Sequence, residues 1–462
     1  MQPCHSFAAL SVRFDDPNLV SCAGLVPVVE LARRSGLVDL VEQRSTVPGA
    51  NASAKVSTLV AGMLAGADSI EDMDLLRHGG MGRLFAGVRA PSTLGTFLRG
   101  FTFGHVRQLD AVAAGVLAGL ARQCPLLPGA EAVAFVDIDD TVRRTYGHAK
   151  QGAGYGYSGV KGLNALLATI STPQAAPVIA AARLRKGSAN SARGAARLVA
   201  DALKVASRAG ADPKAGSLVI VRADSAYYNR DVIAAARRAG ARFSVTARMD
   251  PLVRKAIASI DEAAWTPIRY PNAVFDEQEQ RWISDAEVAE VPFTAFGSQR
   301  ARDGIDGRLI VRRVKRLNPA TVPAGQHELF AAHRHHAVFT DSPLTLLQAE
   351  TGHRQHAIIE QVIADLKNGP LAHLPSGRFN ANAAWLVLAT IAFNLLRATG
   401  ALTSLFHARA TTATLRTQLI NIPARLATSA RRLTLHLPTH WPWADAWHEL
   451  FTALQPPPPP PA

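Results

Sequence analysis

The stretch AVAFVDIDDT at residues 132–141, together with SLVIVRADS at residues 217–225, decides the fold of this chain. Each run is apolar for about the length of a strand and is followed by acidic residues, which are Asp137 and Asp139 in the first run and Asp224 in the second. Side chains alternate between the two faces of a strand, so Asp137 and Asp139 share a face. Ligands bind at the carboxyl ends of strands in open α/β sheets, because the loops there leave a crevice. The two runs therefore predict an acidic site at one edge of a sheet.

The segments around these runs limit the topology. Three strand-like segments precede one helix, and two further strands flank a second helix, which gives the order β-β-β-α-β-α-β. The segments are 132–138, 163–171, 177–184, 192–208, 217–222, 230–238 and 242–247. Three hairpin-connected strands followed by α/β crossovers form a mixed sheet with helices packed on it, which is the element order of the ribonuclease-H-like fold. We therefore expect an α/β fold with a ribonuclease-H-like mixed-sheet core.

The rest of the chain divides by periodicity and turn signals into further units. The expected units are a helical N-terminal domain (1–125), the core (126–260 and 340–400), a β-rich insertion (261–339), a helical basic C-terminal region (401–455) and an extended polyproline tail (456–462). For the N-terminal domain, DNA-end binding and a plain scaffold role are both open interpretations, because no clear helix-turn-helix pattern stands out. Within the core, the glycine pattern 154–159 fits a dinucleotide fingerprint but opens no helix, so we interpret it as a hairpin.

Composition points to an acidic partner. The 50 Lys and Arg residues outnumber the 36 Asp and Glu residues and leave a formal net charge of +14. Nucleic acid is the leading candidate partner, and the alternative is an enzyme whose charge only aids solubility. Three widely spaced cysteines do not suit a disulfide framework or a zinc ribbon, and the first residues do not resemble a signal peptide, so we expect a cytoplasmic protein. The apolar stretch 383–396 is interpreted as a buried core helix and not as a membrane span.

A third acidic residue lies on a helix expected at residues 353–367. Its apolar stripe, which should pack on the sheet, is Ile359, Val362, Ile363 and Leu366. Glu360 is beside that stripe, and His356, Glu360 and Lys367 follow one another along one side of the helix. For this helix alone, a solvated amphipathic face is the alternative interpretation.

Two strand-borne aspartates and one helix-borne glutamate at one sheet edge would suit two divalent cations. Mg²⁺, or Mn²⁺, prefers hard oxygen ligands and would complete its coordination with water and substrate phosphate. Two ions roughly 3.5 to 4 Å apart activate an attacking water or 3′-hydroxyl and stabilise the leaving oxygen. The pattern thus indicates phosphodiester cleavage and strand transfer.

At these residues the sequence resembles the DDE transposases of bacterial insertion sequences, especially the group with a β insertion between the second Asp and the Glu. The resemblance extends over roughly residues 132–396. The similar segments are 137–141, 146–147, 151–153, 161–162, 222–225, 353–354, 359–360, 365–367 and 380–384.

The resemblance implies a catalytic and metal-binding triad of Asp139, Asp224 and Glu360. Asp139 is preferred as the first member because it begins an acidic-x-Thr unit, and Asp137 is the alternative. Related transposases carry the signature Tyr-x2-Arg-x3-Glu-x6-Lys on the Glu helix. Glu360 and the following Lys match it, whereas His353 stands at the Tyr position and another His at the Arg position.

The same resemblance implies DNA contacts. Phosphate-binding roles fall to Lys367, Arg354, His356 and Lys161, and Trp282 in the insertion would stack on an extruded base, with a core role as the alternative for that ring. The protein would bind terminal inverted repeats and target DNA as a homodimer in a synaptic complex, associated with the nucleoid. Two other activities stay open: a catalytically inactive or repurposed DNA-binding protein, and a metal-dependent nuclease without strand transfer.

Overall fold

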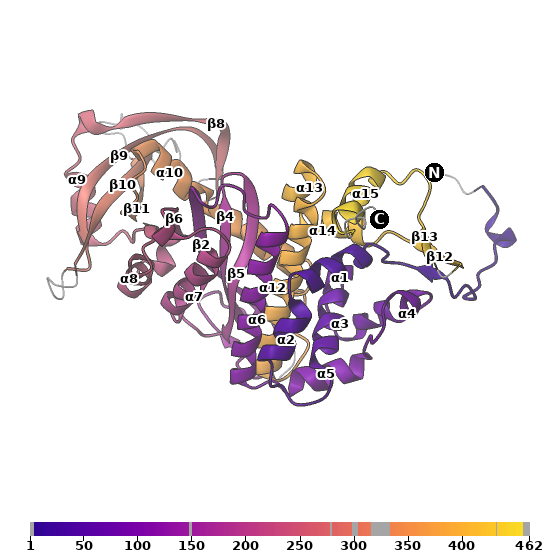
Figure 1. Ribbon diagram of the computed structural model, residues 1–462. Coiled ribbons are helices and arrows are strands. Elements are labelled where there is room, and N and C mark those ends of the chain that lie inside the picture. Colours follow the sequence, from indigo (N-terminus) through magenta and orange to yellow (C-terminus); the bar gives the residue numbers. More distant parts are fainter. Residues whose placement is uncertain are drawn as a thin grey trace.

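The computed structural model describes residues 4–146, 150–277, 280–297, 304–315, 333–430 and 432–455. The expected polyproline tail, 456–462, and Gly147 of the similar segment 146–147 lie outside the described residues. The chain forms a mixed α/β structure, with a large sheet toward one end and a cluster of helices toward the other (Figure 1).

Five neighbouring strands of a ten-stranded sheet form the centre of the described structure. They are β2 (Val133–Arg144), β4 (Lys161–Thr172), β5 (Ala175–Lys186), β6 (Leu218–Ala223) and β7 (Arg242–Thr246), in the spatial order β5-β4-β2-β6-β7. β4 runs antiparallel to β2 and β5, whereas β6 is parallel to both β2 and β7. Helices α7 (Ala195–Arg208) and α8 (Arg230–Arg238) connect the later strands. The predicted order β-β-β-α-β-α-β is confirmed.

The first strand is longer than its apolar run indicates. The sequence predicts an end at residue 138, but β2 continues to Arg144, because its second half pairs with β4 as far as Gly162. Asp139 and Asp140 therefore lie inside a strand and not after it, which corrects the expected position of the first acidic group.

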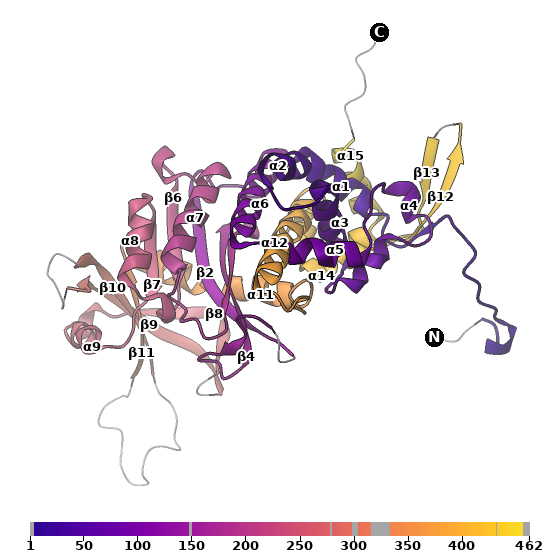
Figure 2. The same cartoon turned by 90° about the horizontal axis from the view of Figure 1, so that it is seen from below.

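The β-rich insertion continues the central sheet. Its strands are β8 (Thr266–Asp276), β9 (Arg281–Ala295), β10 (Ile305–Lys315) and β11 (His333–Thr340). β11 pairs antiparallel with β7, so that residues 338–340 lie opposite 244–246, and β10, β9 and β8 follow outward. Figure 2 shows this sheet at the opposite end of the molecule from the N-terminal segment.

The helical end is built around one long apolar helix. α12 (Phe379–Ala401) packs against β5 and against the N-terminal helices α3 (Ala52–Ala65) and α6 (Phe103–Gln123). Around them lie α1 (Leu25–Arg34), α2 (Leu37–Arg44), α4 (Met81–Leu84) and α5 (Pro91–Arg99). Among the described residues α12 alone is long and apolar enough to span a membrane, but 89% of its apolar window is buried inside the protein. α12 is therefore a core helix, as the sequence predicts.

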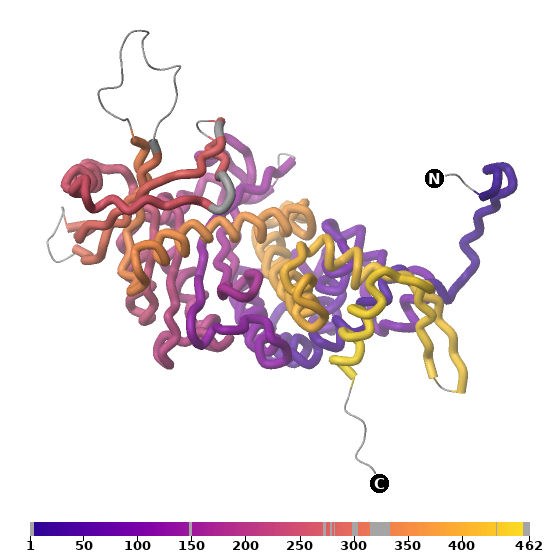
Figure 3. The backbone as a smooth tube through the Cα atoms, turned by 90° about the horizontal axis from the view of Figure 1, so that it is seen from above, coloured from indigo at the N-terminus to yellow at the C-terminus, as the bar shows by residue number. Residues whose placement is uncertain are grey.

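The C-terminal region is only partly helical. Short helices α13 (Leu405–Arg409), α14 (Thr412–Leu415) and α15 (Ala444–Ala453) accompany a hairpin of β12 (Ala424–Ser429) and β13 (Arg432–His436). β12 also pairs with β1 (Leu19–Val20), so the C-terminal chain lies against the N-terminal part (Figure 3). The prediction of a helical region is wrong for β12 and β13, which pair with each other as a local hairpin and, through β12, with β1.

The helix expected at residues 353–367 is divided in two. α10 (Leu346–Arg354) is followed by the 3-10 turn η8 (Gln355–Ala357) and then by α11 (Ile358–Lys367). His353 and His356 lie on either side of the change in winding, and each makes a side-chain contact with the sheet.

Candidate active site

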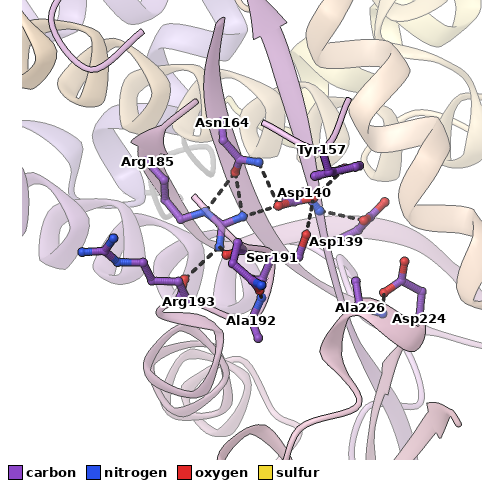
Figure 4. A network of polar contacts seen from close by, with 11 residues as sticks. Asp139, Asp140, Tyr157, Asn164, Arg185, Ser191, Ala192, Arg193, Asp224 and Ala226 are labelled. Atoms are coloured by element: carbon purple, nitrogen blue, oxygen red, sulfur yellow. Dashed lines mark hydrogen bonds and ion pairs between the residues drawn. The ribbon is translucent and has the colours of Figure 1, made fainter. Parts of the chain in front are cut away.

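Asp139 and Asp224 come together because their strands are parallel neighbours. Asp137 lies opposite Arg222 in the register of β2 and β6, so Asp139 lies level with Asp224 two residues further along. Asp224 follows β6 directly and caps the 3-10 turn η4 (Ser225–Tyr227) by accepting a hydrogen bond from the Ala226 backbone at 2.9 Å. Figure 4 shows both carboxylates on the side of β2 away from Arg185.

Both carboxylates of this pair have raised pKa values. Burial raises the pKa of Asp139 to about 6, and the charge of Asp224 contributes to the rise, although the Asp140 backbone N–H donates a hydrogen bond to Asp139 at 2.7 Å. Limited hydration likewise raises the pKa of Asp224 above its ordinary value. Within the described residues, neither carboxylate forms an ion pair with Lys or Arg. Two such oxygen donors match the preference of a hard divalent cation.

Asp137 is held in a closed ion pair. Its side chain has 0% exposure, and its two oxygens accept hydrogen bonds from Arg222 at 2.6 and 2.7 Å, while His356 Nδ1 lies 3.1 Å away. The Arg222 guanidinium also lies 4.0 Å from the ring centroid of Phe135. Burial acts to raise the pKa of Asp137, but Arg222 and His356 outweigh it, and the net pKa is lowered. Of the two candidates left open by the sequence, Asp139 is thus the accessible one.

Sequence reasoning missed this ion pair, although a signal for it exists. Arg222 interrupts an otherwise apolar strand and has a side-chain exposure of 2%. A buried guanidinium requires an acidic partner, and the nearest candidate in a neighbouring strand is Asp137.

Asp140 anchors a second polar network on the other face of β2. It pairs with the buried Arg185 and accepts a hydrogen bond from the Asn164 amide at 2.8 Å. The hydroxyl groups of Ser191 and Tyr157 each lie 3.4 Å from Asp140 Oδ1 (Figure 4). This network, which the sequence analysis did not anticipate, fixes the backbone that carries Asp139.

Glu360 does not complete a metal-binding group with this pair among the described residues. It is an exposed residue in the first turn of α11, which contacts β2. Within the described ranges no group of three or more His, Cys, Asp or Glu side chains lies close enough to hold a metal ion. The structure therefore brings together two of the three acidic residues expected from the sequence.

The two histidines of the Glu helix make contacts within the protein. His353 lies 2.9 Å from the hydroxyl groups of both Ser244 and Thr246, and burial lowers its pKa to about 3. Its ring is stacked on that of His356, with centroids 6.3 Å apart. The positions of the family's Tyr and Arg are thus occupied by side chains that connect α10 and η8 to the sheet.

Other expected DNA contacts lie at different places around the sheet. Lys367 is the last residue of α11 and Lys161 the first of β4, and both are half-buried. Arg354 pairs with Glu350 at 2.8 Å and lies 4.4 Å from the ring centroid of Tyr270 in β8.

Trp282 and Trp265 differ in environment. Trp282 in β9 is 68% exposed and meets Phe275 edge-to-face with ring centroids 5.3 Å apart. Trp265 is half-buried beneath Arg313, whose guanidinium lies 4.2 Å from its centroid. Of these two rings, that of Trp282 is the more exposed to solvent.

Comparison with known families identifies the family of the chain. The family model described as transposase DDE domain group 1 matches residues 3–459, which is nearly the whole chain. No curated protein matches the sequence. Because the family match extends well beyond half of its length, the chain belongs to the DDE transposases.

Proposed function

We propose that this transposase binds the terminal inverted repeats of an insertion sequence, cleaves the DNA strands there and joins the 3′ ends to target DNA. The observation that carries the proposal is the juxtaposition of Asp139 and Asp224 at neighbouring parallel strands, with pKa values raised by burial. Such a pair supports metal-dependent chemistry at phosphorus.

The sheet topology supports a ribonuclease-H-like core. The antiparallel strands β5, β4 and β2 lie side by side, and β6 and β7 follow, parallel to β2. Helices form the later connections. In this proposal β8 to β11 form the insertion between the second and third acidic residues.

The donor set suits Mg²⁺ or Mn²⁺, two ions for each active site. Asp139 and Asp224 would hold them, and Glu360 is assigned as the third ligand by its place in the family pattern and by the contact of α11 with β2. When bound, the metal would supply Lewis-acid activation of the attacking oxygen and stabilisation of the leaving one. Asp137 contributes by holding Arg222 and His356, and it binds no metal in this proposal.

The chain's basic residues would bind the phosphate backbone. The net charge of +14 favours salt-dependent association with DNA. We assign direct phosphate contacts to Lys161, Lys367, Arg354 and His356, and base stacking to Trp282. Two DNA ends require two active sites, so the proposed working form is a homodimer in a synaptic complex, in the cytoplasm at the nucleoid.

The test is cleavage of labelled DNA that carries the inverted repeats flanking the gene, with Mg²⁺ or with EDTA. Asp224→Asn and Glu360→Gln are compared with the native protein and with Asp231→Asn, a control carboxylate whose side chain is 78% exposed on α8. We expect metal-dependent nicking by native protein and control, and none by the other two variants. Activity retained by Glu360→Gln would remove Glu360 from the triad.

A non-catalytic DNA-binding protein is the second candidate, because His353 and His356 depart from the family signature. Native protein that binds the ends with a strong salt dependence but never cuts them, with either metal, would favour this candidate.

A further inference from the structure

The connection from β2 to β4 carries an unusual concentration of exposed aromatic rings. The chain has six tyrosines, and three of them lie in this connection: Tyr146, Tyr155 and Tyr157, with exposures of 73%, 68% and 75%. The remaining three are buried. Because large rings are generally placed away from water, an exposed ring that also contacts the acidic site is a candidate binding contact.

The hairpin that bears two of these rings is held firmly. β3 (Gly154–Tyr155) pairs with the start of β4, and the Gly187 backbone N–H donates a hydrogen bond to Gly152 at 3.0 Å. A Cβ atom at Gly156 would lie 2.5 Å from the Gly187 carbonyl oxygen, and one at Gly187 would lie 2.0 Å from that of Gly162. The glycines thus allow backbones to pack directly together, and the glycine pattern has a structural use.

Tyr157 is the ring nearest to the acidic residues. Its hydroxyl donates a hydrogen bond to Asp140 at 3.4 Å, while its ring stays exposed (Figure 4). Burial of the hydroxyl raises the pKa of Tyr157, and the charges of Asp140, Asp139 and Asp224 add to the rise. The phenol therefore stays neutral, and its hydroxyl is directed at Asp140.

We propose that Tyr157 stacks on the nucleobase next to the scissile phosphate and so positions the terminal nucleotide of the DNA end. The inference rests on the proposed function and deepens it by naming a substrate contact. The hydroxyl of Tyr157 is already bonded to Asp140 and the ring is exposed, so the side chain offers a stacking face for a base and not a free donor for a phosphate oxygen. Stacking on one aromatic ring changes binding by roughly 5- to 150-fold and tolerates any base.

The test uses full-length protein and end DNA with 2-aminopurine at the terminal position, in EDTA, so that binding is measured without cleavage. Tyr157→Phe keeps the ring, Tyr157→Leu removes it, and Tyr146→Leu is the matched control on the same connection. We expect the native protein, Tyr157→Phe and the control to quench the fluorophore and bind alike. Tyr157→Leu should lose the quenching and bind the end at least roughly fivefold more weakly.

Two results would overturn the inference. Unchanged quenching and affinity in Tyr157→Leu would show that the ring does not stack, and equal losses in Tyr157→Phe would assign the effect to the hydroxyl. Cleavage of the same DNA by native protein in Mg²⁺ is read separately. If the native protein cuts and Tyr157→Leu binds and quenches as the native protein does, only the stacking contact is refuted. If the native protein neither binds nor cuts, the proposed function is refuted as well.

Discussion

Replacing Arg222 by Met tests the closed ion pair beneath the acidic site. Asp137 and Arg222 have side-chain exposures of 0% and 2%, and Arg222 donates two hydrogen bonds to the carboxylate. Met approximates the length of the Arg stem but leaves Asp137 without its main cation.

The expected loss is large. Leaving one partner of a buried pair uncompensated costs about 3 to 5 kcal/mol. His356 still lies 3.1 Å from Asp137, so we expect the free energy of unfolding to fall by about 3 kcal/mol, the lower end of that range. The double variant Asp137→Leu/Arg222→Met removes both charges, so it should lose much less.

The effect should also depend on pH. The native pKa of Asp137 is lowered, so its ionised form stabilises the native protein above the unfolded pKa, near 3.8, and that contribution is lost as pH falls through the folded pKa. In Arg222→Met the buried acid protonates more readily, so the deficit should shrink as pH falls from 8 to 5.

Urea unfolding followed by tryptophan fluorescence measures these differences. Arg269→Met is the control, because Arg269 is 88% exposed in a surface ion pair with Asp285, and it should change little. The reasoning fails if Arg222→Met has the same urea midpoint as the native protein, or if the double variant loses as much unfolding free energy as the single variant.

Three further predictions follow from charge and burial. Asp139→Asn should raise the urea midpoint in EDTA at pH 8, because the native pKa of Asp139, about 6, exceeds the unfolded value of 3.8. The stability contributed by Asp139 is full below pH 3.8 and is lost as pH rises through 6. A midpoint at pH 8 equal to that of the native protein would be contrary evidence. The native protein should lose stability between pH 7 and 5, because the pKa of His353 is about 3 when folded and 6.5 when unfolded, so only the unfolded chain gains a proton in this range. His353→Gln should weaken that loss. Equal slopes of unfolding free energy against pH in the two proteins would count against this prediction. Iodoacetamide should label Cys4 but not Cys22 or Cys124 in the native protein, because the latter two thiols are buried. Burial raises the pKa of both, that of Cys124 to about 12. Mass spectrometry of digests checks this, and a second labelled thiol would contradict it.

Local sequence pattern was enough for much of the sheet. The runs before Asp137 and Asp224 are short and largely apolar, so the presence of both strands and of the connecting helices, although not the end of β2, follows from periodicity. The same pattern placed two acidic residues at one sheet edge. It did not distinguish Asp137 from Asp139, because that distinction depends on Arg222, a residue of the neighbouring strand.

Features that depend on distant partners could not be predicted. Residues 139–144 of β2 form against β4, and β12 pairs with the distant β1 as well as with the adjacent β13, so part of the pairing lies outside each local window. The break between α10 and α11 falls where His353 and His356 contact the sheet, and an amphipathic pattern does not register such contacts.

The packing of α12 has a consequence for synthesis on the ribosome. α3 and α6 emerge early, but the helix that covers their apolar faces begins only at Phe379. At ordinary translation rates the first helices wait roughly tens of seconds for it, exposed to chaperones and proteases. We expect a nascent chain stopped before Phe379 to be cut by protease throughout residues 25–123, and a released one to be degraded. A premature stop codon would then leave no stable N-terminal fragment to compete with the intact protein.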